Sequence, residues 1–246
     1  MALLLLMHSA IGNRLLMWSA GRGDDKLLRV VLLLGASVNA KDKNGGTVLF
    51  YAAGEGHTST VKLLVAAGAD ATVVDKRDNT ALCYALRTRQ PNTELMQILI
   101  EQGALKVQSQ HGSPLMCIEF STSSEAYIEI LLKNGVEADT ANASGYTPLL
   151  KFAYDGNSNA VTTLLRHGAR VNAVTVDGKT AISEAVIQGN DDIVELLLNA
   201  GADRNVRIGG QNLVDIATDQ LKSYQGANPF MTRKYNRIVE LLEGGR

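Results

Sequence analysis

The chain has 246 residues, of which 46% are hydrophobic and 20% are charged, and its formal net charge is −1. This composition is typical of a folded protein and excludes a disordered one. Proteins that bind nucleic acid through its phosphates carry a strong excess of basic residues, so the near-neutral charge disfavours that class. The two cysteines, Cys83 and Cys117, lie in no paired motif, and such sparse cysteine favours a reducing compartment.

The N-terminal residues are apolar from Ala2 to Met7, but His8 and Ser9 follow at once. A secretory signal would begin with positive charge and continue through about 7–15 apolar residues. A membrane-spanning helix would need about 20 apolar residues, and no stretch approaches that length. We therefore expect the packed end of a first helix here, with a targeting segment as the alternative, and no membrane insertion.

A glycine that ends an aliphatic cluster recurs along the chain, and successive copies are 33, 35, 32, 33 and 33 residues apart. These glycines are Gly35, Gly68, Gly103, Gly135, Gly168 and Gly201. About ten residues after each of the first five comes a turn signal, at Gly45-Gly46-Thr47, Asp78-Asn79-Thr80, Gly112-Ser113-Pro114, Gly145-Tyr146-Thr147 and Gly178-Lys179-Thr180. The constant phase predicts about seven units including imperfect ends, at residues 8–40, 41–73, 74–108, 109–140, 141–173, 174–206 and 207–246.

Each unit is predicted to contain two helices and a hairpin loop. Thr147 can cap a first helix that begins at Pro148, because its hydroxyl accepts from free backbone N–H groups and proline suits the first helical position. A break with a glycine, such as Gly56, precedes a second helix with apolar residues at helical spacing. The recurring glycine can adopt the left-handed conformation that ends this helix. The predicted fold class is therefore an all-α solenoid.

This pattern resembles the ankyrin repeat over nearly the whole chain, most closely at Gly145-Tyr146-Thr147-Pro148-Leu149 and Gly168-Ala169-Arg170-Val171-Asn172-Ala173. Some units depart from the pattern. The third has Ala81 where proline is usual and two extra residues around Arg89-Gln90-Pro91, and the fourth has Ile118-Glu119 in place of an alanine pair. Gly12 to Ala20 is predicted to be a degenerate first repeat, and the last unit contains an insertion near 218–234.

The resemblance implies one elongated, curved domain covering residues 1–246, with a concave face on which partner proteins dock. That face would be built from the loop tips and the exposed side of each first helix. Carried over to this sequence, the family pattern predicts partner-binding residues at Lys43, Lys76, Arg77, Arg87, His111, Phe120, Tyr146, Tyr154, Asp155 and Lys179.

Two groups within this set have alternative interpretations. Together with Lys41 and Arg89, the basic residues of the second and third units would either attract an acidic segment of a partner or form an ordinary solvated edge. Phe120, Tyr146 and Tyr154 would either anchor a partner or fill irregular packing around the degenerate fourth unit.

The sequence contains no motif typical of a catalytic, cofactor-binding or metal site. The chain lacks a phosphate-binding Gly-x-x-x-x-Gly-Lys-[Ser/Thr] run, and its histidines fall at different phases of the repeat. His57 is expected to hydrogen-bond the backbone, and the cysteines are expected to be small buried hydrophobic residues. Arg22-Gly23-Asp24 is assigned to an interhelical turn, and Asn39 and Asn172 are expected to hydrogen-bond their own turns.

The sequence therefore predicts a non-catalytic module that binds another protein as an adaptor, scaffold or inhibitor. We expect no cofactor, no metal, no nucleic-acid partner and a monomeric, cytoplasmic protein. Two alternatives stay open: an effector released into a host cell, which would then act in the host cytosol, and a regulatory fragment of a larger enzyme.

Overall fold

The computed structural model describes residues 10–88, 91–107, 112–119 and 124–244. The chain divides into two compact units, one made of residues 1–110 and 117–134 and the other of residues 111–116 and 135–246. The secondary structure of the described residues is helical apart from one two-stranded hairpin and an isolated bridge residue, which confirms the predicted all-α class. The organisation as a single domain of about seven repeats stays a prediction.

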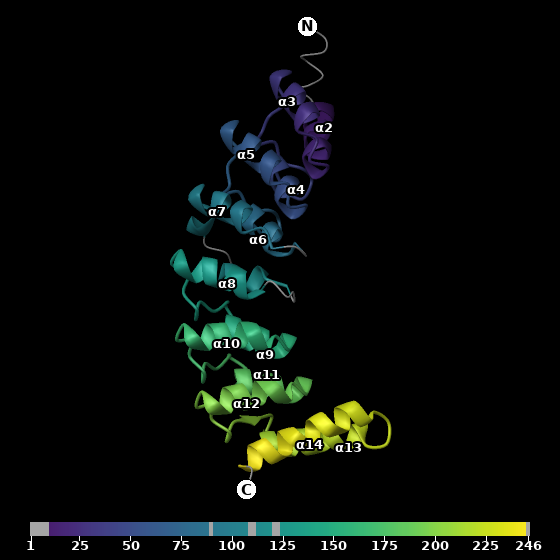
Figure 1. Ribbon diagram of the computed structural model, residues 1–246, viewed down its shortest axis with the longest axis vertical. Coiled ribbons are helices and arrows are strands. Elements are labelled where there is room, and N and C mark those ends of the chain that lie inside the picture. Colours follow the sequence, from purple (N-terminus) through teal and green to yellow (C-terminus); the bar gives the residue numbers. More distant parts are fainter. Residues whose placement is uncertain (1–9, 89–90, 108–111, 120–123, 245–246) are drawn as a thin grey trace. The chain divides into compact units, whose positions relative to one another are not determined.

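The first unit is a stack of antiparallel helix pairs (Figure 1). In it, α4 packs against both α2 and α6, and α5 packs against α3 and α7, so that first helices contact first helices and second helices contact second helices. Its elements are α2 (Ala10–Gly21), α3 (Asp25–Leu33), α4 (Val48–Gly54), α5 (Thr58–Ala66), α6 (Ala81–Leu86), α7 (Thr93–Glu101), the 3₁₀ helix η1 (Ala104–Lys106) and α8 (Ser124–Lys133). The short 3₁₀ helix η2 (Pro114–Cys117) lies where the chain passes between the two units.

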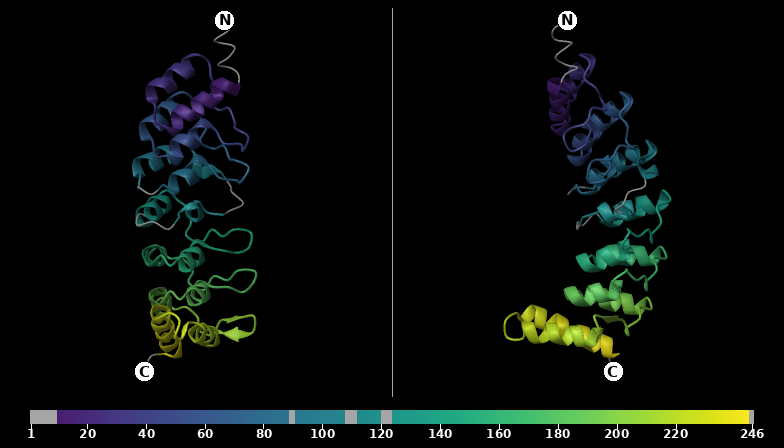
Figure 2. Two further views of the ribbon diagram at one scale, coloured as in Figure 1. Left: turned by 90° about the vertical axis from the view of Figure 1, so that its right-hand side faces the viewer. Right: turned by 180° about the vertical axis from the view of Figure 1, so that it is seen from behind.

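The second unit repeats the same arrangement, with α9 against α11 and α11 against α13. Its hairpin loops project to one side of the helices (Figure 2). The elements are α9 (Pro148–Asp155), α10 (Ser158–Arg166), α11 (Ala181–Gln188), α12 (Asp191–Asn199), β1 (Arg207–Ile208), β2 (Gln211–Asn212), α13 (Leu213–Tyr224) and α14 (Pro229–Glu243). The two strands pair antiparallel, with Arg207 opposite Asn212.

Threonine occupies the N-cap position of α4, α6, α9 and α11, as the turn signals predicted, and its side chain accepts a cap hydrogen bond in α6, α9 and α11. The Thr147 hydroxyl accepts from the backbone N–H of Leu150, and Pro148 occupies the first turn of α9. Thr180 forms a reciprocal capping box with Ser183 at the start of α11. Such caps satisfy N–H groups that a helix leaves free at its N-terminus. The prediction from sequence is therefore confirmed at these positions.

Glycine ends the second helices in the predicted way. Gly68 and Gly201 follow α5 and α12 with φ angles of 85° and 88°, in the left-handed region. A residue with a Cβ atom is disfavoured in this conformation, which explains why the period of the sequence is set by glycine.

Asparagine side chains join neighbouring repeats, and this corrects the expectation that they would bond their own turns. The Asn39 amide donates to the Gly68 carbonyl and accepts from the Asp70 N–H, both at 2.9 Å. Asn172 makes the equivalent bonds to Gly201 and to Asp203, which is 31 residues further along. These residues act between repeats because the turn one period later lies beside them.

Cys83 and Cys117 form a disulfide, with Cα atoms 5.1 Å apart. Both are buried, as expected for small hydrophobic residues, but they are bonded to each other although they lie in no paired motif of the sequence. They meet because they are 34 residues apart, one more than the repeat period, on the adjacent elements α6 and η2. A disulfide is typical of an oxidising compartment, so cysteine content no longer supports a reducing one.

The residues of the expected insertion near 218–234 lengthen the last helix pair. Helices α13 and α14 have 12 and 15 residues, and Asn228 caps α14 by accepting from Met231 N–H. The rings of Tyr224 and Tyr235 stack between them at a centroid distance of 5.7 Å. The additional residues therefore form further helical turns of α13 and α14.

Candidate functional site

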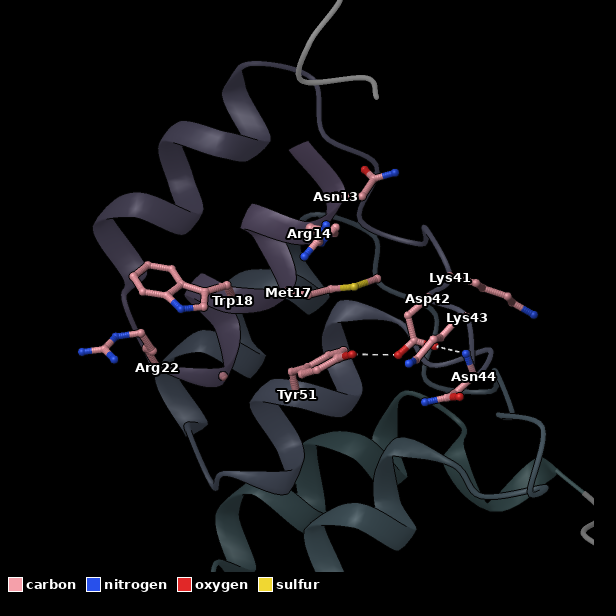
Figure 3. Close-up of a pocket in the computed structure, with 11 residues that line it drawn as sticks. Asn13, Arg14, Met17, Trp18, Arg22, Lys41, Asp42, Lys43, Asn44 and Tyr51 are labelled. Atoms are coloured by element: carbon pink, nitrogen blue, oxygen red, sulfur yellow. Dashed lines mark hydrogen bonds between the residues drawn. The ribbon is translucent and has the colours of Figure 1, made fainter. Parts of the chain in front are cut away.

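An open groove of about 860 Å³ lies on the surface of the first unit (Figure 3). It lies between α2, the start of α4 and the tip of the hairpin loop that precedes α4. The lining residues are Asn13, Arg14, Met17, Trp18, Gly21, Arg22, Lys41, Asp42, Lys43, Asn44 and Tyr51. Aromatic and cationic side chains thus border the same space.

Helix α2 supplies one wall of this groove. Its residue Trp18 is 54% exposed, and the Arg22 guanidinium carbon lies 5.1 Å from the centre of the indole ring, a cation–π contact. Met17 lies between Trp18 and the loop in Figure 3 and is itself buried. A large apolar surface on Trp18 is therefore accessible beside a positive charge.

Asp42 holds the loop in place on the other side of the groove. Its Oδ1 accepts from the N–H groups of Asn44 and Gly46, at 2.7 and 2.9 Å. Its Oδ2 accepts from the Tyr51 hydroxyl of α4 at 2.7 Å. Burial, and next the hydrogen bond to Asp42, raise the pKa of Tyr51 to about 12, so the phenol stays protonated and continues to donate at neutral pH.

The next loop is anchored in the same way. Asp75 accepts from the N–H groups of Arg77 and Asn79 and from the Tyr84 hydroxyl, at 2.8, 2.9 and 2.8 Å. Burial raises the pKa of Asp75, but these hydrogen bonds together outweigh it and leave the pKa below its usual value. A second hollow of about 310 Å³ is bordered by both anchors, and the Lys76 N–H donates to the Asn44 carbonyl of the previous loop at 2.8 Å.

The predicted basic residues of the first unit lie in different settings. Lys43 lines the groove, and Lys76 and Arg77 are exposed on the next loop. Arg87 contacts the Asn79 side-chain oxygen at 3.0 Å and Glu119 at 3.7 Å, and its guanidinium carbon lies 5.8 Å from the Tyr84 ring centre. Arg89 lies outside the described residues.

The remaining predicted residues that the structure describes belong to the second unit. Tyr154 is 48% exposed, whereas Tyr146 is half-buried. Burial, followed by the negative charges of Glu184 and Asp155, raises the pKa of Tyr146 above its usual range. Asp155 is paired with Lys151 at 2.5 Å.

Lys179 forms an ion pair with the buried carboxylate of Glu184 at 3.3 Å. This second-unit cation therefore already has a carboxylate partner within the protein. His111 and Phe120 lie outside the described residues, so their predicted roles stay predictions.

Sequence reasoning missed Trp18, Arg14, Arg22 and Tyr51 as members of the candidate site. Trp18 is the single tryptophan of the chain, which was one available signal. Another was the recurrence of a tyrosine nine residues after a loop aspartate, at Asp42 and Tyr51 and again at Asp75 and Tyr84.

Other expected contacts are found as predicted. The His57 Nε2 atom lies 3.2 Å from the Gly21 carbonyl oxygen, a backbone contact. Asp24 caps α3, which places Arg22-Gly23-Asp24 in an interhelical turn.

Within the described residues, no cluster of three potential metal-ligating side chains is present, and no helix is both long and apolar enough to span a bilayer.

Comparison with known proteins agrees with the helix-pair architecture. The family model described as ankyrin repeats (3 copies) matches residues 16–111 and 115–208. The ankyrin repeat domain of human ASB11 aligns with a TM-score of 0.75 and 24% identity over 93% of this chain and 97% of that chain.

The ankyrin repeat domain of Bcl-3, described as a unique member of the IkappaB protein family, aligns with a TM-score of 0.70 and 24% identity. This alignment covers 94% of this chain and 98% of that chain. No curated protein matches the chain in sequence. At these identities the two structures establish the fold, and the family model covers well over half of the residues. The chain belongs to the ankyrin-repeat family.

Proposed function

We propose that the chain is a non-catalytic adaptor, scaffold or inhibitor that binds a partner protein on the concave face formed by its loop tips and first helices. Ankyrin repeat domains generally mediate protein–protein interaction. The observation that carries the proposal is the groove of the first unit, where exposed aromatic surface lies beside cationic side chains. Large aromatic and arginine side chains are the residues that most often dominate binding energy at protein interfaces.

The fixed loops support this function energetically. Asp42 and Asp75 each hold two N–H groups of their own loop and a tyrosine hydroxyl of the following helix. Successive loops are also joined, by Lys76 to Asn44 in the first unit and by Val176 to Ser144 in the second. Side chains on such loops are held near their bound positions before a partner arrives, which lowers the entropic cost of association.

Affinity capture from the native cell extract tests the proposal. We compare the wild-type chain with Arg77→Glu and Tyr154→Ala, which change one exposed side chain in each unit. As a charge-matched control, Arg233→Glu alters an exposed residue of α14. Loss of the same protein from either test variant, with recovery by the control, supports the concave face. Equal recovery by all the chains would contradict this assignment.

Tyr146 provides a further check because it is only half-buried. If Tyr146→Ala weakens partner binding while the thermal midpoint stays near that of the wild type, the side chain acts in recognition. A midpoint several degrees lower would assign it to packing instead.

A further inference from the structure

The groove at Trp18 has an unbalanced charge. Four cationic side chains border it: Arg14, Arg22, Lys41 and Lys43. Within the part of the chain that the structure describes, none of the four has a carboxylate oxygen within 4.0 Å. Asp42 is the only carboxylate in the lining, and its oxygens already accept hydrogen bonds from Asn44, Gly46 and Tyr51. The groove therefore presents positive charge that the protein itself does not neutralise at close range.

The Trp18 indole and the two loop lysines occupy different ends of the groove. In Figure 3, Trp18 and Arg22 lie at the end far from the loop, whereas Lys41 and Lys43 lie on the loop. Arg14 and Met17 lie between these ends. A peptide bound along the groove would thus contact the indole face at one end and the ammonium groups at the other.

We propose that this groove binds an acidic segment of the partner protein, with one large aliphatic or aromatic side chain against Trp18 and with aspartate or glutamate residues facing Arg14, Lys41 and Lys43. The inference rests on the proposed function and specifies the chemistry of the partner. Apolar burial on Trp18 supplies an anchor, and the cations, which have no carboxylate at ion-pair distance, attract and select for negative charge.

An acidic peptide matches these features better than a nucleic acid does. The whole chain has a net charge of −1, so it carries no overall excess of positive charge. Binding to a phosphate backbone would be favoured by a basic surface that continues beyond one short groove. A peptide can instead combine a few carboxylates with one apolar side chain, in the proportion that the groove offers.

Trp18 reports directly on the groove because it is the only tryptophan of the chain. The probe is a short synthetic peptide in which aspartates and glutamates flank a single leucine, titrated into the 246-residue chain. We expect the tryptophan emission to move to shorter wavelength as the leucine covers the indole. Affinity should fall about tenfold for a peptide with asparagine and glutamine in place of the acids, for one with serine in place of leucine, and for the parent peptide at high salt.

Charge-reversal variants test the cationic rim. Arg14→Glu with Lys43→Glu should weaken binding of the acidic peptide at least about tenfold. The matched control is Lys26→Glu with Arg29→Glu, which makes the same charge change on exposed residues of α3 that do not line the groove. Circular dichroism verifies folding, and Lys43→Glu alone replaces the double variant if that variant does not fold.

Several results would overturn the inference. The inference would lose its chemical basis if the affinity did not change when the acidic residues or the leucine of the peptide are replaced. Tighter binding of a single-stranded oligonucleotide of equal charge would have the same consequence. Short-wavelength emission in the free protein at every concentration would show that the chain covers Trp18 itself, and a shift that depends on protein concentration would assign the groove to a second copy. Capture of a partner that still depends on Arg77 or Tyr154 would then leave the proposed function standing without this groove.

Discussion

Reduction of the Cys83–Cys117 disulfide should strongly destabilise the first unit. The two residues are 34 positions apart in the sequence. In the chain-entropy model, closing a loop of that size removes about 13 cal/mol/K from the unfolded chain, which is about 4 kcal/mol at about 25 °C. Domains of ordinary stability unfold at a cost of about 5–15 kcal/mol, so this single bond contributes a large share.

The place of the disulfide explains why the loss should be large. Cys117 ends η2, a 3₁₀ helix of four residues, where α4 and α9 have seven and eight residues at the equivalent stage of the repeat. So short a helix has few backbone hydrogen bonds of its own. The covalent link to Cys83 on α6 therefore ties this short element to a well-packed neighbour.

Urea unfolding followed by circular dichroism measures the effect, with the protein oxidised or treated with a phosphine reductant. At an m-value of about 2 kcal/mol/M, the predicted loss lowers the midpoint of the affected transition by about 2 M. The control is Cys83→Ala with Cys117→Ala, in which the reductant should change nothing. Equal midpoints for oxidised and reduced wild type, or two free thiols in protein purified without reductant, would refute the reasoning.

Three further substitutions test buried polar groups and an alkaline titration. Thr47→Val should raise the free energy of unfolding by about 1 kcal/mol, because the buried hydroxyl has no hydrogen-bond partner in the described structure, whereas Thr180→Val should lower it by about 1 kcal/mol by removing a helix cap. Both are read from urea unfolding, and equal losses would contradict the assignment of Thr47. Lys179→Met should lower the free energy of unfolding by about 2 kcal/mol, because Glu184 is left buried without its cation. Adding Glu184→Gln should restore part of this stability. If the double variant is less stable than Lys179→Met alone, the broken ion pair is not the cause of the destabilisation. The pKa of Tyr51 in the folded protein is about 12, above its ordinary value of 10.0, so the protonated phenol stabilises the fold fully below about pH 10 and this stability is lost as pH rises toward 12. In a pH series of thermal midpoints, Tyr51→Phe should reduce the fall of the midpoint over this range. An unchanged pH dependence would show that the phenol is not shielded.

Local signals in the sequence were sufficient to predict the helices. A threonine cap, a proline in the first turn and a glycine at the end act within a few residues, as at Thr147, Pro148 and Gly168. The helix start at Pro148 and the left-handed glycine at Gly168 were predicted correctly, because neither depends on distant parts of the chain.

Contacts between repeats were harder to predict because they depend on side-chain direction as well as spacing. The positions of Cys83 and Cys117 in neighbouring repeats were visible in the sequence, but a disulfide also requires Cα atoms about 4.4–6.8 Å apart and converging Cβ atoms. Asn39 was assigned to its own turn because such bonds are common there. In the structure, the next turn offers it both a carbonyl and an N–H at 2.9 Å.

The groove was missed for a related reason. Gly12 to Ala20 was treated as a degenerate terminal repeat, whose apolar residues would be expected to pack as a cap. Helix α2 does bury Leu16 and Met17, but its period leaves Trp18 on the exposed side. Whether a tryptophan on a terminal helix is packed or exposed depends on the neighbouring loop, which sequence spacing does not position.

The two units use equivalent loop positions differently, and in the first unit this leaves the lysines beside Asp42 without an ion pair in the groove. Asn142 accepts the same loop N–H bonds as Asp42, from Ser144 and Tyr146 at 3.0 Å each, but nine residues later the chain has Lys151 instead of a tyrosine. Lys151 pairs with Asp155 on its own helix, so cation and carboxylate neutralise each other there. In the first unit, the tyrosine occupies the loop carboxylate with a neutral hydrogen bond, and the nearby lysines have no such partner in the groove. A preference for acidic partners follows from this pairing and does not require an excess of basic residues in the chain as a whole.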